Sequence, residues 1–125
     1  IVRSEGAVVM LDLDGDGDER TGWVFMYLHL SNKDKIQPGM LVKKGDAIGH
    51  PSCEGGEATG THVHVARKYN GEWIPAGGTL AFTLEGWTAD QGSMAYIGTL
   101  KKHGRTVEAC TCSDPASQIT AGKYN

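Results

Sequence analysis

The sequence has no long hydrophobic stretch. None of the apolar runs in its 125 residues approaches the ~18 residues that a membrane-spanning helix needs. Sustained helical periodicity is missing too, because no window keeps apolar residues at i, i+3, i+4 and i+7 through successive turns. These absences argue against a membrane span and against long amphipathic helices, and they leave short strands and turns as the expected structure.

Excess positive charge is also absent. The chain carries 12 Lys and Arg against 15 Asp and Glu, which gives a formal net charge of −3, and its basic residues form no cluster. Nucleic-acid-binding domains concentrate Lys and Arg on one face or along one stripe. We therefore expect no nucleic-acid partner.

Cysteine is scarce, and its count is odd. The three residues are Cys53, Cys110 and Cys112. In a secreted protein an odd count suggests one disulfide and a free thiol, or a partner cysteine outside this segment. A bridge between Cys110 and Cys112 would be strained, so the candidate disulfide joins Cys53 to one of these two.

Aromatic residues are few at 7%, whereas the 18 glycines are about twice the usual share. The β-branched runs between the glycines are typical of short strands joined by tight turns. A chain of this length can bury one modest core. We predict an all-β fold of antiparallel sheets, with a main domain over residues 1–78 and a β-rich extension packed on it over residues 79–125.

Two alternating segments predict the first hairpin. Residues 7–13 and 22–30 have strand character and flank an acidic, glycine-containing turn at residues 14–19. In the second strand the even-numbered residues are all aliphatic, which makes their face the better candidate for the core. We therefore expect His29 to lie on the more open side of the sheet.

Further strands are expected downstream. Residues 36–49 predict two short strands with a Pro-Gly turn and a Lys-Gly-Asp turn. The Asn70-Gly71 pair predicts a type I′ turn that joins residues 64–69 to residues 72–74. Three more short strands are expected in the extension, at residues 80–84, 94–100 and 105–109.

Residues 59–66 alternate and predict a strand that carries two histidines. Side chains on a strand repeat every two residues, so His62 and His64 leave the same face, roughly 7 Å apart. Neutral imidazole binds zinc and titrates near neutral pH, so such a pair suits a metal ligand beside a general acid or base. A chance pair on a half-exposed strand fits the same pattern.

Three motifs within residues 6–75 carry a resemblance when they are taken in order. They are Tyr27-Leu28-His29-Leu30-Ser31, Gly39-x5-Gly45-Asp46-x-Ile48-Gly49 and Thr59-Gly60-Thr61-His62-Val63-His64. The ordered set resembles the lysostaphin-type zinc metallopeptidase family, whose members cut peptide cross-links in bacterial cell walls. The second motif alone would also fit biotinyl or lipoyl carrier domains, but those carriers lack paired histidines.

The resemblance implies a barrel-sandwich-like core and a role for each histidine. His64 would be a zinc ligand, and His62 and His29 would be the catalytic histidines. The expected substrate is a peptidoglycan peptide, and the expected location is the bacterial cell envelope or the outside of the cell.

The sequence departs from the family pattern at the metal. The other two ligands of such enzymes come from an upstream His-x-x-x-Asp segment, and this chain has no histidine before His29. A catalytic zinc needs about three protein ligands. Because the chain begins at Ile1 without an initiator Met, we expect a processed or truncated piece of a longer protein, inactive when isolated.

The acidic turn suggests a different ion. Its sequence begins like a calcium loop, but the twelfth position is Trp23 rather than a bidentate Glu, which excludes an EF-hand. A calcium site that uses Asp14, Asp16 and Asp18 is one interpretation, and a solvated hairpin turn is the other.

Two alternatives to an enzyme stay open. The chain could be a non-catalytic extracellular protein that assembles through an exposed sheet edge, where unpaired backbone groups can pair with another chain. It could also be a carrier or adaptor domain of the biotinyl type. Zinc content separates the first from an enzyme, and a modified lysine would identify the second.

Overall fold

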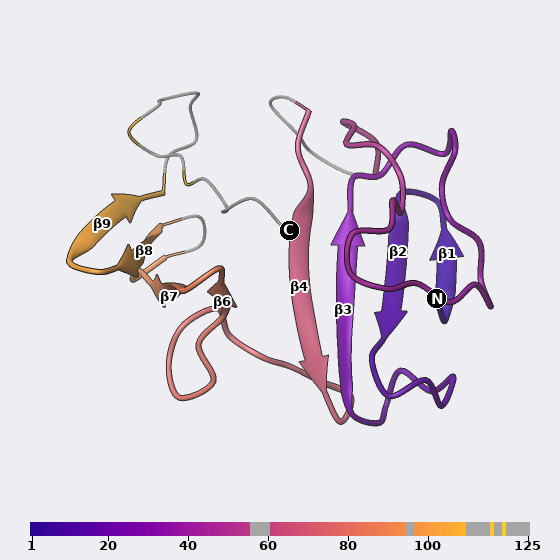
Figure 1. Ribbon diagram of the computed structural model, residues 1–125, viewed down its shortest axis with the longest axis horizontal. Coiled ribbons are helices and arrows are strands. Elements are labelled where there is room, and N and C mark those ends of the chain that lie inside the picture. The colour runs from indigo at the N-terminus through magenta and orange to yellow at the C-terminus, as the bar shows by residue number, and fades with distance from the viewer. Residues whose placement is uncertain (56–60, 95–96, 110–115, 117–118, 120–125) are drawn as a thin grey trace. The chain divides into compact units, whose positions relative to one another are not determined.

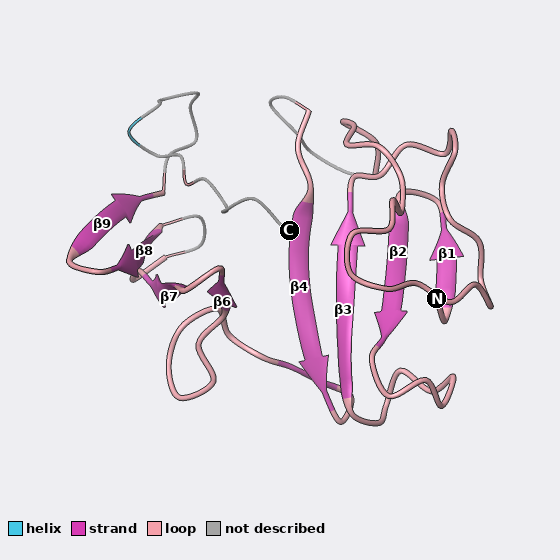
Figure 2. Cartoon of the chain, in the orientation of Figure 1, coloured by secondary structure: helices cyan, strands magenta, loops and turns pink. Residues whose placement is uncertain are grey.

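The computed structural model describes residues 1–55, 61–94, 97–109, 116 and 119. Apart from a single 3₁₀ residue at Ala116, the regular structure of these residues is β, and its strands form two antiparallel sheets (Figures 1 and 2). The all-β prediction is confirmed. The described ranges hold no helix with the length and apolarity to span a membrane. The chain divides into two compact units, Ile1–Ile74 and Pro75–Asn125.

The first unit contains a five-stranded sheet in which the strands follow chain order. Its strands are β1 (Arg3–Glu5), β2 (Val8–Asp12), β3 (Trp23–Leu28), β4 (His64–Tyr69) and β5 (Glu72–Trp73). Strand β3 pairs with β2 on one side and with β4 on the other, so it lies at the centre of the sheet (Figure 1).

Both faces of this sheet bury apolar side chains. Val9 pairs with Tyr27 across β2 and β3, and Val9 and Leu30 form a core cluster with Ile36, which comes from the loop after β3. On the opposite face Met10 and Val24 have relative exposures of 1% and 0%. On the predicted aliphatic face Val24 is buried, but Met26 and Leu28 are only half-buried. The aromatic face is covered as well, because Tyr27 packs against the core cluster.

His29 does not lie on an open side of the sheet, and that prediction is wrong. The residue is 4% exposed. It follows the last residue of β3 and has a φ of 71°, in the left-handed region, so the strand alternation ends before it. The backbone turns there and carries His29 inward.

Residues 36–49 form turns but no strand, so the prediction of two strands here is wrong. The Pro-Gly and Lys-Gly-Asp turns are present, with positive φ at Gly39 (86°) and Gly45 (95°). The two turns break the segment into pieces too short for a ladder. Ile36 N–H still donates to the Ile48 carbonyl at 3.0 Å, and both side chains pack on the core cluster.

The second unit contains a four-stranded meander. Its strands are β6 (Thr83–Leu84), β7 (Trp87–Gln91), β8 (Gly98–Lys102) and β9 (Arg105–Glu108). Among its described residues the buried apolar side chains are Trp87 and Val107, at 4% and 6% exposure. The Arg105 guanidinium lies 5.6 Å from the centre of the Trp87 ring. Strand β7 was not predicted from the sequence.

Two-residue turns with the same φ pattern close three of the hairpins. Each turn places a non-glycine residue and then a glycine at positive φ, as a type I′ turn requires. The pairs are Asn70-Gly71 (49° and 83°), Glu85-Gly86 (49° and 83°) and His103-Gly104 (49° and 77°). The type I′ turn predicted at Asn70-Gly71 is confirmed.

Candidate functional site

Three histidines meet where β3 ends and β4 begins. His29 directly follows β3, and His64 is the first residue of β4, where it pairs with Leu28. His62 lies two residues before His64 and forms an isolated bridge with Ser52. The ring of His29 lies 4.5 Å from that of His62 and 6.3 Å from that of His64, measured between centroids. The structure therefore brings together the three histidines that the sequence singled out.

We name the set of His29, His62 and His64 the histidine cluster, and it is buried on one side and open on the other. His29 is buried, whereas His62 and His64 are exposed. A buried imidazole beside two accessible ones allows a fixed orientation for the first and ligand access to the others.

Residues 52–54 hold His29 in place. The Ser52 N–H and the Ser52 hydroxyl both donate to the His29 carbonyl, at 2.7 and 2.9 Å. The Glu54 N–H donates to the Ser52 hydroxyl at 3.1 Å, which closes the loop on itself. The backbone of His29 is therefore fixed by a segment more than 20 residues away in sequence.

The ring of His29 makes one hydrogen bond that decides its tautomer. Its Nδ1 lies 2.7 Å from the Glu54 carbonyl oxygen. A carbonyl can only accept, so Nδ1 carries the proton and donates it. In the neutral ring the lone pair is then on Nε2, which is the nitrogen left to accept a proton or bind a metal.

The histidine cluster is not a ready three-ligand metal site. A compact metal site would need three His, Cys, Asp or Glu side chains with ligand atoms within 4.8 Å of one another. Within residues 1–55, 61–94 and 97–109 one such group exists, and it lies elsewhere, at the acidic loop between β2 and β3. His29 also commits its Nδ1 to Glu54. Among the described residues, the cluster therefore does not offer three converging ligands to one ion.

The acidic loop gathers a different set of carboxylates from the predicted one. Asp14 and Asp16 lie together with Asp12, and Asp18 is held by the guanidinium of Arg20 at 2.9 and 3.0 Å. The hydrogen bond with Asp12 raises the pKa of Asp14. The loop also bonds within itself, since the Gly17 N–H donates to Asp12 at 2.8 Å. Calcium binding here stays a prediction.

Hydrogen bonds also lower the pKa values of Asp16 and Asp18 in this loop. The hydroxyl of Thr21 donates to Asp16 and lowers its pKa. The side chain of Arg20 lowers the pKa of Asp18 to about 2. Both groups are therefore ionised at neutral pH.

Cys53 is exposed, with a free thiol as far as the described residues extend. Cys110 and Cys112 lie outside the described residues. The predicted disulfide is therefore not tested.

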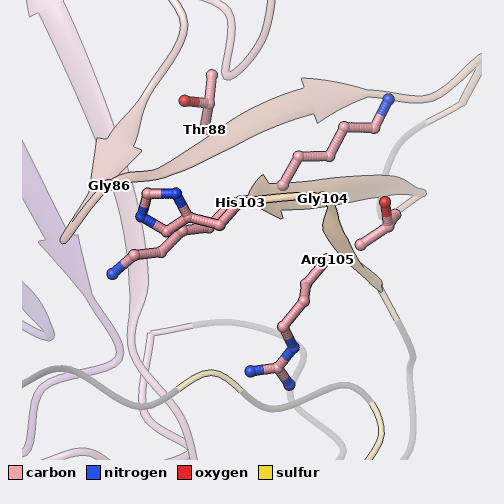
Figure 3. A pocket seen from close by; sticks show the side chains of 8 residues that line it. Gly86, Thr88, His103, Gly104 and Arg105 are labelled. Carbon is pink, nitrogen blue, oxygen red and sulfur yellow. The ribbon is translucent and has the colours of Figure 1, made fainter.

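A shallow hollow of about 520 Å³ lies in the second unit, at the turn between β8 and β9 (Figure 3). Basic side chains line it, but they do not converge. Figure 3 shows Thr88 and Arg105 pointing in opposite directions. Lys102 Nζ donates to the Glu85 carbonyl at 2.6 Å, and Lys101 Nζ lies 3.8 Å from Asp90. Two of the basic side chains of this hollow are therefore engaged with acceptors of their own.

Sequence reasoning missed Ser52, Glu54 and Asn32. The Asn32 N–H donates to a carboxylate oxygen of Glu54 at 3.0 Å, so all three residues contribute to the support of His29. A serine and a glutamate in a glycine-containing loop carry no distinguishing signal, because their partners lie more than 20 residues away.

Comparisons of the chain with protein-family models, with curated proteins and with solved structures gave no match.

Proposed function

We propose that the histidine cluster belongs to a zinc-dependent endopeptidase site that acts on peptide bonds of bacterial peptidoglycan. The observation that supports this most is the meeting of three imidazoles from two separate segments, with ring centroids 4.5 and 6.3 Å apart. The ordered motifs around these residues support it independently. A peptidoglycan substrate would locate the protein in the cell envelope or outside the cell.

In this proposal each histidine has its own task. His64 is the metal ligand, and His62 and His29 are the acid–base residues. Positioned acid–base groups typically contribute ~10²–10⁴-fold to a rate. His29 is suited to this task because its tautomer leaves Nε2 free of a proton in the neutral ring. Bound zinc would supply a hydroxide near neutral pH, because it lowers the pKa of its water to ~7.

The described residues do not complete a zinc site. His64 is one ligand, and about three protein ligands are needed. Within the described ranges no second and third ligand lie with it in a compact group. We therefore propose that the described residues bind zinc weakly by themselves and are inactive without ligands supplied from elsewhere.

The test measures metal and turnover separately. Zinc content is determined by elemental analysis, and new amino termini released from purified cross-linked peptidoglycan report hydrolysis, in this chain and in any longer gene product that contains it. His64→Ala should lose zinc, whereas His62→Ala should keep zinc and lose turnover. His103→Ala is the matched control, because His103 is an exposed histidine of the β8–β9 turn.

Two results would overturn the proposal. One is hydrolysis that neither substitution in the histidine cluster reduces. The other is a complete gene product without zinc and without hydrolysis, and this would favour the non-catalytic alternative. Self-assembly through a sheet edge would then be examined at β1 and β5, the short edge strands of the first sheet.

A further inference from the structure

Four hydrogen bonds join residues 52–54 to the turn at residues 29–32. Two are the bonds from Ser52 to the His29 carbonyl, and one is the bond from the His29 ring to the Glu54 carbonyl. The fourth runs from the Asn32 N–H to the carboxylate of Glu54. Ser52 and Glu54 thus each bond to this turn through both main chain and side chain, and of these two residues Glu54 is the one that contacts the ring of His29.

We infer that Glu54 is a positioning residue for His29. Its carboxylate anchors the loop to Asn32, and that anchor places its own carbonyl against Nδ1 of His29. The bond to Asn32 has a charged acceptor but is exposed, at 3.0 Å, whereas the bond to the His29 ring is part-buried, at 2.7 Å. The carboxylate therefore attaches the loop, and the carbonyl holds the ring. The role in catalysis rests on the function proposed above, but the effect on the ring of His29 does not.

The loop is seated from a second side. A Cβ atom built on Gly55 would lie 2.5 Å from the Cβ of Ala7 and 3.2 Å from a methyl group of Leu28. The backbone after Glu54 therefore lies directly on the start of the sheet. Ser52 and Gly55 therefore hold the chain on either side of Glu54, and the bond of its carboxylate to Asn32 sets how the Glu54 carbonyl between them is oriented.

Without the bond from its carboxylate to Asn32, the carbonyl of residue 54 would no longer be held against Nδ1 of His29. His29 is 4% exposed, so an Nδ1–H that lost its acceptor would have poor access to water. The ring would then be driven towards the other tautomer or another orientation. Glu54→Ala should therefore change the protonated nitrogen of His29 without any change in His29 itself.

The experiment is ¹⁵N NMR of the histidine-labelled chain near pH 8, about 1.5 units above the ordinary pKa of histidine. His29→Gln assigns the signals of His29. We expect an Nδ1–H signal from His29 in the wild-type chain and its loss in Glu54→Ala. Glu54→Gln keeps an oxygen acceptor for Asn32 and should retain the signal. Glu72→Ala, on the exposed strand β5, is the control and should leave the signal unchanged.

Neither zinc nor substrate is needed for this readout, so the inference and the proposed function can fail separately. Retention of the Nδ1–H signal in Glu54→Ala would overturn the inference and leave the proposed function standing. If Glu54→Ala does not fold, the test uses Glu54→Gln instead. A Glu54→Gln variant that folds like the wild type but lacks the Nδ1–H signal would overturn the inference. In an active gene product, Glu54→Ala should lower kcat with little change in KM, and Glu54→Gln should restore kcat.

Discussion

Arg3 and Glu19 form a two-point ion pair that ties the acidic loop to the sheet. Nε and Nη2 of Arg3 donate to the two carboxylate oxygens of Glu19 at 3.0 and 2.9 Å. Lys68 Nζ approaches the same carboxylate at 4.0 Å. A loop that looks like a free acidic hairpin in the sequence is therefore attached to β1 and faces β4.

Glu19→Gln should destabilise the first unit modestly. The carboxylate side chain is 24% exposed and that of Arg3 is 42% exposed, so solvent screens the pair in part. We expect a loss of about 0.5–1 kcal/mol in the free energy of unfolding, measured by urea denaturation. Asp90→Asn is the matched control, because the Asp90–Lys101 pair is well exposed on both sides and should contribute close to nothing. Equal losses for the two variants would contradict this assignment.

Burial of Lys35 predicts a larger effect. The residue is 8% exposed, and its Nζ donates to the Gly6 carbonyl and to the side chain of Asn32 at 3.2 Å. Lys35→Met keeps the apolar stem but removes the donor, which should cost about 1–3 kcal/mol in the free energy of unfolding. The exposed neighbour Lys33 provides the comparison, since Lys33→Met should change stability by less than about 0.5 kcal/mol.

The sequence predicts well those features that residues adjacent in the chain determine. Asn70-Gly71 encodes its turn because a type I′ turn needs two residues that tolerate positive φ. The strand expected over residues 59–66 is described only from His64, and His62 precedes it in an isolated bridge with Ser52. The pairing of His64 with Leu28 then brings β4 beside the end of β3, where His29 lies. This part of the candidate site follows from local pattern and antiparallel pairing.

Contacts between residues far apart in the sequence determine the position of His29 and the conformation of residues 36–49. His29 was expected on an open side, but hydrogen bonds from Ser52 and Glu54 fix its backbone and its ring. In residues 36–49, Ile36 belongs to the core cluster and Val42 and Ile48 pack against it, but the segment forms no ladder. Neither outcome is encoded near the residues concerned.

The acidic loop predicts a specific response to pH. The side chain of Arg20 lowers the pKa of Asp18 from 3.8 to about 2. A lowered carboxyl pKa means that the interaction is fully present above pH 3.8 and is lost as the pH falls through about 2. Arg20→Gln should therefore raise the pKa of Asp18 towards 3.8, as followed by NMR titration of its carboxyl carbon. An unchanged pKa would show that Arg20 is not the cause.

Gly55 offers the sharpest test of how the loop beside the histidine cluster is seated. Gly55→Ala would place a Cβ 2.5 Å from that of Ala7, at a φ of 82° that alanine rarely adopts. Two separate costs therefore add, namely the strain of the backbone and the steric overlap with the sheet. We expect a loss of at least about 2 kcal/mol in the free energy of unfolding.

Gly45→Ala separates these two costs. Gly45 has a similar φ of 95°, but no atom lies within 4 Å of a Cβ built there. Its substitution should therefore show the backbone cost alone, about 1 kcal/mol. The difference between the two variants measures the contact of residue 55 with Ala7 and Leu28. If Gly55→Ala were no more destabilising than Gly45→Ala, the loop would not rest on the sheet, and the support that it gives to His29 would have to come from the hydrogen bonds of Ser52 and Glu54 alone.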